Sequence, residues 1–142
     1  MKILLAVDGS RYALDAVDSL IQHADWYREK PAVELVTVHL PVPKLPRMSL
    51  VVGKNQIKRY YEEEGEACLR AARKKLDAAG IAYNAQILVG QPGETIVAHA
   101  RRMRCDLILV GSQGRSAARN LLVGSVATRV LQLATMPVML VK

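Results

Sequence analysis

The chain has 142 residues, of which 51% are hydrophobic, and a formal net charge of +7. This length fits one domain with one core, and the hydrophobic content excludes a disordered chain. No apolar run approaches the ~20 residues of a membrane-spanning helix. The apolar run after Met1 ends at Asp8, which is too early for a signal peptide. We therefore expect a cytoplasmic protein with a single domain over residues 1–142.

Strand-like and helical patterns alternate along the chain. Strands are predicted at residues 2–7, 33–40, 81–89, 106–110 and 137–141. Helices are predicted at about 13–24, 52–79, 94–103 and 125–134. Continuous apolar strands that alternate with helices indicate an α/β fold, with an open parallel sheet covered by helices on both faces. Polar residues interleave the third strand, so we expect it near an edge of the sheet.

The positive charge lies in the second half of the chain. Residues 1–71 hold ten basic and ten acidic side chains, whereas residues 72–142 hold ten basic and three acidic ones. A basic half suits an anionic ligand. Proteins that bind single-stranded nucleic acid usually present stacking aromatic rings, and this half contains only Tyr83. Nucleic acid is therefore an unlikely partner.

The most informative stretch runs from Asp106 to Ser125 and reads DLILVGSQGRSAARNLLVGS. A short apolar strand is followed by Gly111 and Gly114, and then by Gly124 and Ser125 where a helical pattern begins. Glycine allows a ligand to approach where a Cβ atom would block it. The N-terminus of a helix offers unpaired N–H groups and the positive end of a dipole. Together these features predict an anion site of the kind that binds phosphate.

Other nucleotide sites do not fit the sequence. Ligands of open parallel sheets bind outside the carboxyl ends of the strands, and Asp8, His39 and Gly111 follow or end predicted strands. The first strand is followed by no GxGxxG motif, and the chain contains no GxxxxGK[ST] motif. A phospho-receiver would need an acceptor Asp after its third strand, but that strand ends in Val89-Gly90. The first loop, DGSRYA, also matches flavodoxin-like loops poorly.

The glycine pattern, G-x2-G-x9-G-S, resembles that of the universal stress protein family, in its ATP-binding branch. The resemblance extends over essentially the whole chain, including ILLAVDGS at the start, VTVHL, GQPGETI and the final PVMLVK. It implies a Rossmann-like sheet of the adenine nucleotide alpha hydrolase type, with strand order 3-2-1-4-5. It also implies a homodimer formed mostly through the last strand, Pro137 to Val141, since an apolar edge strand favours being covered.

The resemblance implies that one group of residues holds the phosphates and ribose. Backbone N–H groups do this at Gly111, Gly114, Gly124, Ser125 and Val126, helped by the Ser125 hydroxyl. Gln113 would line the phosphate side, although a basic residue or a histidine is common at this position in the family. Arg115 and Arg119 can supply positive charge instead. Binding would order the loop over residues 113–123.

A second group of residues would surround the nucleoside. Val110 would line the ribose side, and Leu40 would contact the adenine edge through backbone hydrogen bonds. Asp8 would lie beside the nucleoside with Ala6 and Val7. Its carboxylate would accept hydrogen bonds from ribose or adenine, or help to hold magnesium on the phosphates. The chain would have no metal site of its own.

We therefore expect a stress protein that binds ATP, ADP or AMP and acts as a regulatory or stress-resistance factor without strong catalysis. One alternative is slow ATP hydrolysis or phosphotransfer, for which Asp8 is the only carboxylate near the loop. Another is a dimeric interaction module in which nucleotide binding is incidental. Asp8 and Ser125 could also serve merely as helix caps.

Cysteine and histidine residues receive only structural interpretations. Cys68 and Cys105 belong to no CxxC or Cys/His pair, so we expect two buried, reduced thiols. His39 is interpreted as a strand-end histidine with its hydrogen bonds satisfied. His23 and His99 fall in predicted helices without an evident partner.

Overall fold

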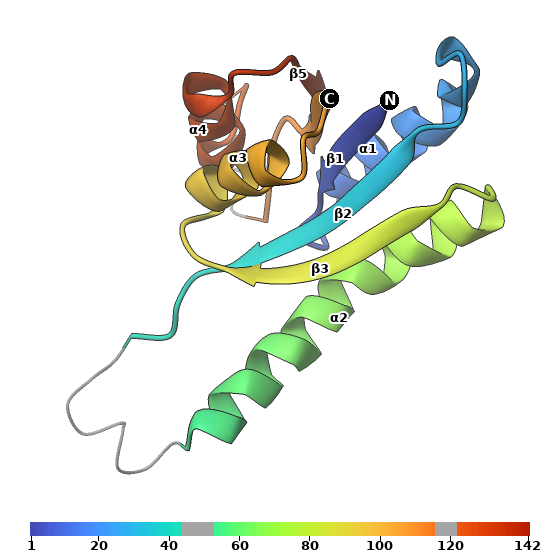
Figure 1. The fold of residues 1–142 in the computed structure, drawn as a ribbon. Coiled ribbons are helices and arrows are strands. Elements are labelled where there is room, and N and C mark those ends of the chain that lie inside the picture. Colours follow the sequence, from blue (N-terminus) through green and yellow to red (C-terminus); the bar gives the residue numbers. More distant parts are fainter. Residues whose placement is uncertain (44–52, 116–121) are drawn as a thin grey trace.

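The computed structural model describes residues 1–43, 53–115 and 122–142. Five parallel strands form one sheet in the order β3-β2-β1-β4-β5, as predicted (Figure 1). The strands are β1 (Lys2–Ala6), β2 (Ala32–His39), β3 (Tyr83–Val89), β4 (Leu107–Gly111) and β5 (Val138–Val141). The third strand lies at one edge, which confirms the expectation from its interleaved polar residues.

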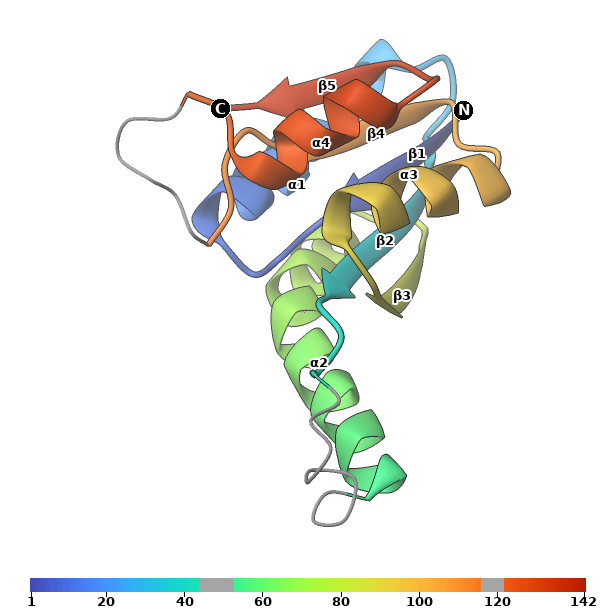
Figure 2. The same cartoon turned by 90° about the vertical axis from the view of Figure 1, so that its left-hand side faces the viewer.

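Two helices cover each face of the sheet. They are α1 (Arg11–Gln22), α2 (Lys54–Ala78), α3 (Pro92–Arg102) and α4 (Ser125–Leu133), and a 3-10 turn, η1 (Ala24–Trp26), follows α1. The helices α1 and α2 pack on one face, and α3 and α4 pack on the other (Figure 2). No boundary differs from its prediction by more than two residues. The first helix ends at Gln22, however, so Ala24 does not continue it.

β1 lies at the centre of the sheet, and its side chains alternate between the two layers. Ile3 and Leu5 join the core beneath α1 and α2. Leu4 and Ala6 join the core beneath α3 and α4. A strand that is covered on both faces has no solvent side, which explains why this segment is continuously apolar in sequence.

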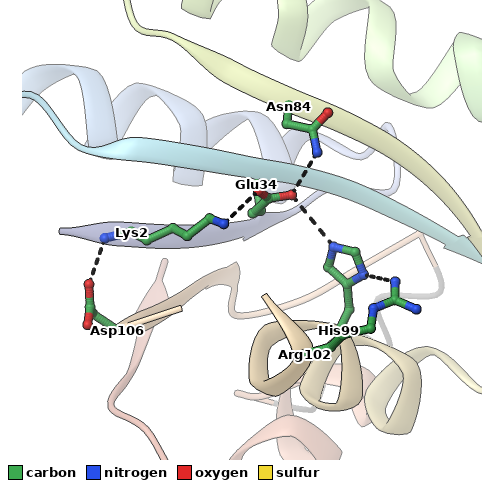
Figure 3. A network of polar contacts seen from close by, with 6 residues as sticks. All are labelled: Lys2, Glu34, Asn84, His99, Arg102 and Asp106. Carbon is green, nitrogen blue, oxygen red and sulfur yellow. Dashed lines mark hydrogen bonds and ion pairs between the residues drawn. The ribbon is translucent and has the colours of Figure 1, made fainter. Parts of the chain in front are cut away.

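The core also contains a buried carboxylate, Glu34 of β2, which is 4% exposed. Its oxygens lie 3.1 Å from Lys2 Nζ and accept a 3.1 Å hydrogen bond from Asn84 Nδ2. The Nε2 atom of His99 on α3 lies 3.7 Å from Glu34 (Figure 3). Arg102 Nη2 donates to His99 Nδ1 at 2.8 Å. The interpretation of His99 as a histidine without a partner is therefore wrong.

The contact with Arg102 fixes the state of the His99 ring. A guanidinium group only donates hydrogen bonds, so Nδ1 accepts and the proton of the neutral ring lies on Nε2, facing Glu34. Burial lowers the pKa of His99, and the charge of Arg102 lowers it further, while Glu34 opposes both effects. The ring is therefore neutral at neutral pH. His23 also has a partner, since its Nδ1 lies 2.8 Å from the carbonyl oxygen of Ser19.

We predict that the free energy of unfolding decreases as the pH falls from 7 towards 5. The pKa of His99 is lowered in the folded state, so the unfolded chain takes up its proton first, near pH 6.5. The stabilisation that results from the lowered pKa of His99 is complete above that pH. It is lost as the pH falls through the lower pKa of the folded state. Urea unfolding between pH 7.5 and 5 should show a shallower pH dependence for His99→Gln than for the parent. Equal dependence in the two proteins would contradict this assignment.

Candidate functional site

A cavity of about 560 Å³ opens at the carboxyl ends of β1, β2 and β4. The strand order reverses between β1 and β4, which is where open α/β sheets bind ligands. The volume falls within the range of small-molecule sites. The residues that the sequence assigned to a site and that the structure describes line this cavity: Ala6, Val7, Asp8, Leu40, Val110, Gly111, Gln113, Gly114, Arg115, Gly124, Ser125 and Val126.

Asp8 connects the loop after β1 to the loop after β4. Its Oδ1 accepts a hydrogen bond from the backbone N–H of Ser10 at 2.9 Å, and its Oδ2 accepts one from the N–H of Arg115 at 3.1 Å. The N-cap of α1 is Ser10, whose side chain accepts from Ala13 N. The alternative in which Asp8 merely caps a helix is therefore wrong.

Two glycines, Gly111 at the end of β4 and Gly114 in the loop after it, stand where a Cβ atom would be too close to its neighbours. A Cβ atom at Gly114 would lie 2.8 Å from Oδ2 of Asp8. One at Gly111 would lie 2.6 Å from the carbonyl oxygen of Tyr12, because the first turn of α1 passes close to the end of β4. Gly111 is therefore required by the packing of α1, whatever it contributes to a ligand.

The backbone N–H of Gly124 is already paired within the protein. It donates to the carbonyl oxygen of Ser112 at 2.7 Å and so joins the two ends of the loop. This corrects the expectation that the N–H would be free to bind phosphate. Arg119, and residues 116–121 of the loop that binding was expected to order, lie outside the described residues.

The first turn of α4 supplies free N–H groups instead. Gly124 is the N-cap and Ser125 is the first residue of the helix, so the alternative of Ser125 as the cap is wrong. The N–H groups of Ser125, Val126 and Ala127 precede the first helical hydrogen bond, from Thr128 N to Gly124 O. The N-cap residue is a glycine and offers no side-chain acceptor, and the first turn, which is fully described, contains no acidic residue. All three residues line the cavity, so the positive end of the helix dipole borders it.

Arg115 is the positively charged side chain among the described residues that line the cavity. Its Nη2 lies 2.9 Å from Sγ of Cys68 on α2, and that thiol lies 3.4 Å from the carbonyl oxygen of Asp8. Cys68 and Cys105 are both buried and free, as predicted. The side chain of Arg115 thus links the cavity to α2.

Sequence reasoning missed several lining residues. They come from all four helices and from β2: Ala13, Val36, Val38, Tyr60, Pro92, Ile96 and Ala127. His39, which the sequence placed at a strand end but interpreted as structural, lines the cavity too. Val36 and Val38 were detectable, because they lie at alternate positions before Leu40 on one face of the same strand. The contribution of Tyr60 depends on how α2 packs against the sheet, which no local pattern specifies.

His39 differs from its interpretation as a satisfied histidine. Its Nε2 atom is buried and has no hydrogen-bond partner among the residues the structure describes. Burial and the charge of Arg115 lower the pKa of His39, whereas Glu64 raises it to a smaller extent. The ring is therefore neutral at neutral pH.

No helix among the described residues is both long and apolar enough to cross a membrane. Residues 1–43, 53–115 and 122–142 also contain no group of three or more His, Cys, Asp or Glu side chains that could hold a metal ion.

Comparison with known proteins agrees with this fold and motif. A family model described as the universal stress protein family matches residues 1–142. The chain belongs to the universal stress protein family. Universal stress protein MJ0531 of Methanocaldococcus jannaschii is 32% identical over 142 residues, which cover 99% of this chain and 81% of that protein. Universal stress protein YxiE of Bacillus subtilis is 30% identical over 99% of this chain and 98% of its own length.

Solved structures of the family share the architecture. The structure of protein MJ0577 superposes with a TM-score of 0.81 at 28% identity and covers 99% of this chain and 94% of its own. A universal stress protein solved in complex with cAMP gives a TM-score of 0.71 at 25% identity, covering 100% of this chain and 97% of its own.

We predict that Asp8→Ala lowers the free energy of unfolding by about 1–3 kcal/mol, because two backbone N–H groups lose a charged acceptor. Asp8→Asn keeps one oxygen and should lose less. Urea unfolding at pH 7 measures both variants. Asp25→Asn, at an exposed position in η1, is the control and should change little. Equal stability of Asp8→Ala and the parent would show that these bonds contribute nothing.

Proposed function

We propose that this universal stress protein binds an adenine nucleotide, ATP with magnesium in the first instance, in the cavity at the carboxyl edge of the sheet. The observation that carries the proposal is the set of N–H groups of residues 125–127, which have no partner among the described residues and border the same cavity as Arg115. Such helix ends bind phosphate groups. The relative solved in complex with cAMP supports an adenine nucleotide as the class of ligand.

Magnesium would arrive with the phosphates of the nucleotide. Asp8 is the only carboxylate among the described residues that line the cavity, and each of its oxygens accepts one backbone hydrogen bond. A carboxylate oxygen has a further lone pair, so Asp8 fits one contact to a phosphate-bound ion. This supports a role for Asp8 as an auxiliary ligand and not as the centre of a metal site.

We propose a regulatory role for the nucleotide and no strong catalysis. Both carboxylate oxygens of Asp8 accept backbone hydrogen bonds that hold two loops together. A carboxylate engaged in this way is less available to act as a general base. A bound nucleotide stabilises the state of the protein that it binds better, by no more than the difference in affinity. Arg115 and Asp8 both contact Cys68 on α2. A change in their positions on nucleotide binding would therefore reach α2 through these contacts.

We also propose that the protein acts in the cytoplasm. Cys68 and Cys105 are buried, free thiols on separate elements. Unpaired thiols of this kind are typical of reducing compartments.

Titration calorimetry with Mg-ATP, AMP and cAMP should show binding to the parent protein. Gly114→Glu should abolish it, because the new side chain meets Asp8 and places negative charge beside the phosphate region. Gly53→Glu is the matched control, because a side chain there meets nothing within 4 Å. An absence of binding at millimolar Mg-ATP would overturn the proposal.

Two further outcomes distinguish the alternatives. Phosphate release that disappears in Asp8→Ala, while ATP binding is retained, would favour slow hydrolysis or phosphotransfer. Unchanged partner binding after Gly114→Glu has abolished nucleotide binding would favour an interaction module that does not respond to ATP.

We further propose a homodimer through the last strand, Pro137 to Val141. β5 is an edge strand that pairs with β4 on one side only. Met139 is 36% exposed, and Trp26 beside it is 73% exposed. A hollow of about 250 Å³ lies between α1, η1 and β5 and is lined by both side chains. An exposed apolar edge of this kind favours pairing with another strand.

The dimer can be tested by light scattering at micromolar concentration, where the parent should give twice the chain mass. Met139→Lys should shift the protein towards monomer, because charge on an edge strand opposes pairing. Val89→Lys on the opposite edge strand is the matched control. Trp26 is the only tryptophan, so its fluorescence should shift to the red on dilution. A monomer at all concentrations, or dissociation by Val89→Lys instead, would contradict this interface.

A further inference from the structure

The cavity has two chemically different parts. One is bordered by the N–H groups at the start of α4, by Gly114 and by Arg115. The other is lined by apolar side chains of β2 and α3: Val36, Val38, Pro92 and Ile96. If a nucleotide occupies the cavity, as proposed above, its phosphates belong in the first part and its base in the second.

Tyr60, on α2, adds an aromatic ring to the lining of the cavity. The first turns of α2 project beyond the carboxyl ends of β2 and β3 (Figure 1). Tyr60 is 51% exposed, so packing in the core does not explain an aromatic residue there. Along the described chain, it is the only Phe, Tyr or Trp side chain that lines the cavity.

The adjacent Tyr61 fixes the position of this part of α2. Its hydroxyl accepts a hydrogen bond from the backbone N–H of Val42 at 2.6 Å, which ties α2 to the chain that leaves β2. Its ring centroid lies 6.4 Å from that of His39 and 5.8 Å from that of Tyr60. The Tyr60 ring is therefore attached to an anchored turn, although the helix around it is exposed.

We infer that Tyr60 is a specificity-determining residue that stacks on the base of the bound nucleotide. This inference rests on the proposed function. A base has an apolar, polarisable face, and an exposed aromatic ring beside an apolar lining matches that face. Stacking of one base on one aromatic side chain strengthens binding roughly five- to 150-fold. The helix α2 would thereby sense whether the ligand carries a base.

The test compares ATP with inorganic tripolyphosphate, which has the charge of ATP but no base. Tyr60→Ala should weaken ATP binding by roughly five- to 150-fold, the equivalent of one stacked base. It should leave tripolyphosphate binding unchanged. Tyr60→Phe and Tyr60→Trp should retain the affinity of the parent for ATP. Arg59→Ala, at the adjacent exposed position, is the matched control.

A second measurement separates stacking from a change in structure. The adenine H2 and H8 proton resonances should move upfield when ATP binds to the parent, and this ring-current shift should be lost in Tyr60→Ala. If the parent binds ATP but Tyr60→Ala binds it equally well, the inference is wrong and the proposed function stands. An equal loss of ATP and tripolyphosphate binding also overturns the inference. If the parent does not bind ATP, the proposed function and the inference fail together.

Discussion

The carboxylate of Asp8 joins two loops that lie 107 residues apart in the chain. Those loops follow β1 and β4, the adjacent strands at which the order of the sheet reverses. Successive connections leave such a point in opposite directions, which opens a crevice at the carboxyl edge. The hydrogen bond from the Arg115 N–H to Asp8 brings Gly114 against the carboxylate, at a distance that leaves no room for a Cβ atom. The shape of the cavity on this side depends on that close contact.

The backbone N–H groups around the cavity divide into those used for structure and those left free. Gly124 and Arg115 use theirs to close the loop and to bind Asp8. The groups left over belong to the first turn of α4, where neither an intrahelical acceptor nor a side chain of the N-cap residue reaches them. Among the residues that the structure describes they have no partner, so they are open to solvent or a ligand. A glycine-rich sequence can thus be required mainly for closure of the loop, while the anion site that we propose lies on the helix that follows.

The sequence was sufficient for the fold and for most of the lining. Continuous apolar strands and amphipathic helices place the elements, because each must bury its apolar side. Site residues at strand ends and in the glycine motif could be found for the same reason, since topology places strand ends together. Tyr60 could not, because its place depends on the packing of α2 against the sheet. The contact between Glu34 and His99 was also missed, because it joins a strand and a helix that are distant in sequence.

The net charge of +7 does not make the lining of the cavity strongly positive, although the basic second half of the sequence suggested that it would. In the part of the chain that the structure describes, several arginines of the basic half have other contacts. Arg129 pairs with Glu94, Arg102 donates to His99, and Arg101 donates to the carbonyl oxygen of Leu133. Arg115 and Asp8 are the charged residues in the described lining, and their formal charges cancel. Long-range charge can speed the approach of an anion, but within the cavity its retention depends on the amide dipoles of α4 and on the orientation of one guanidinium group.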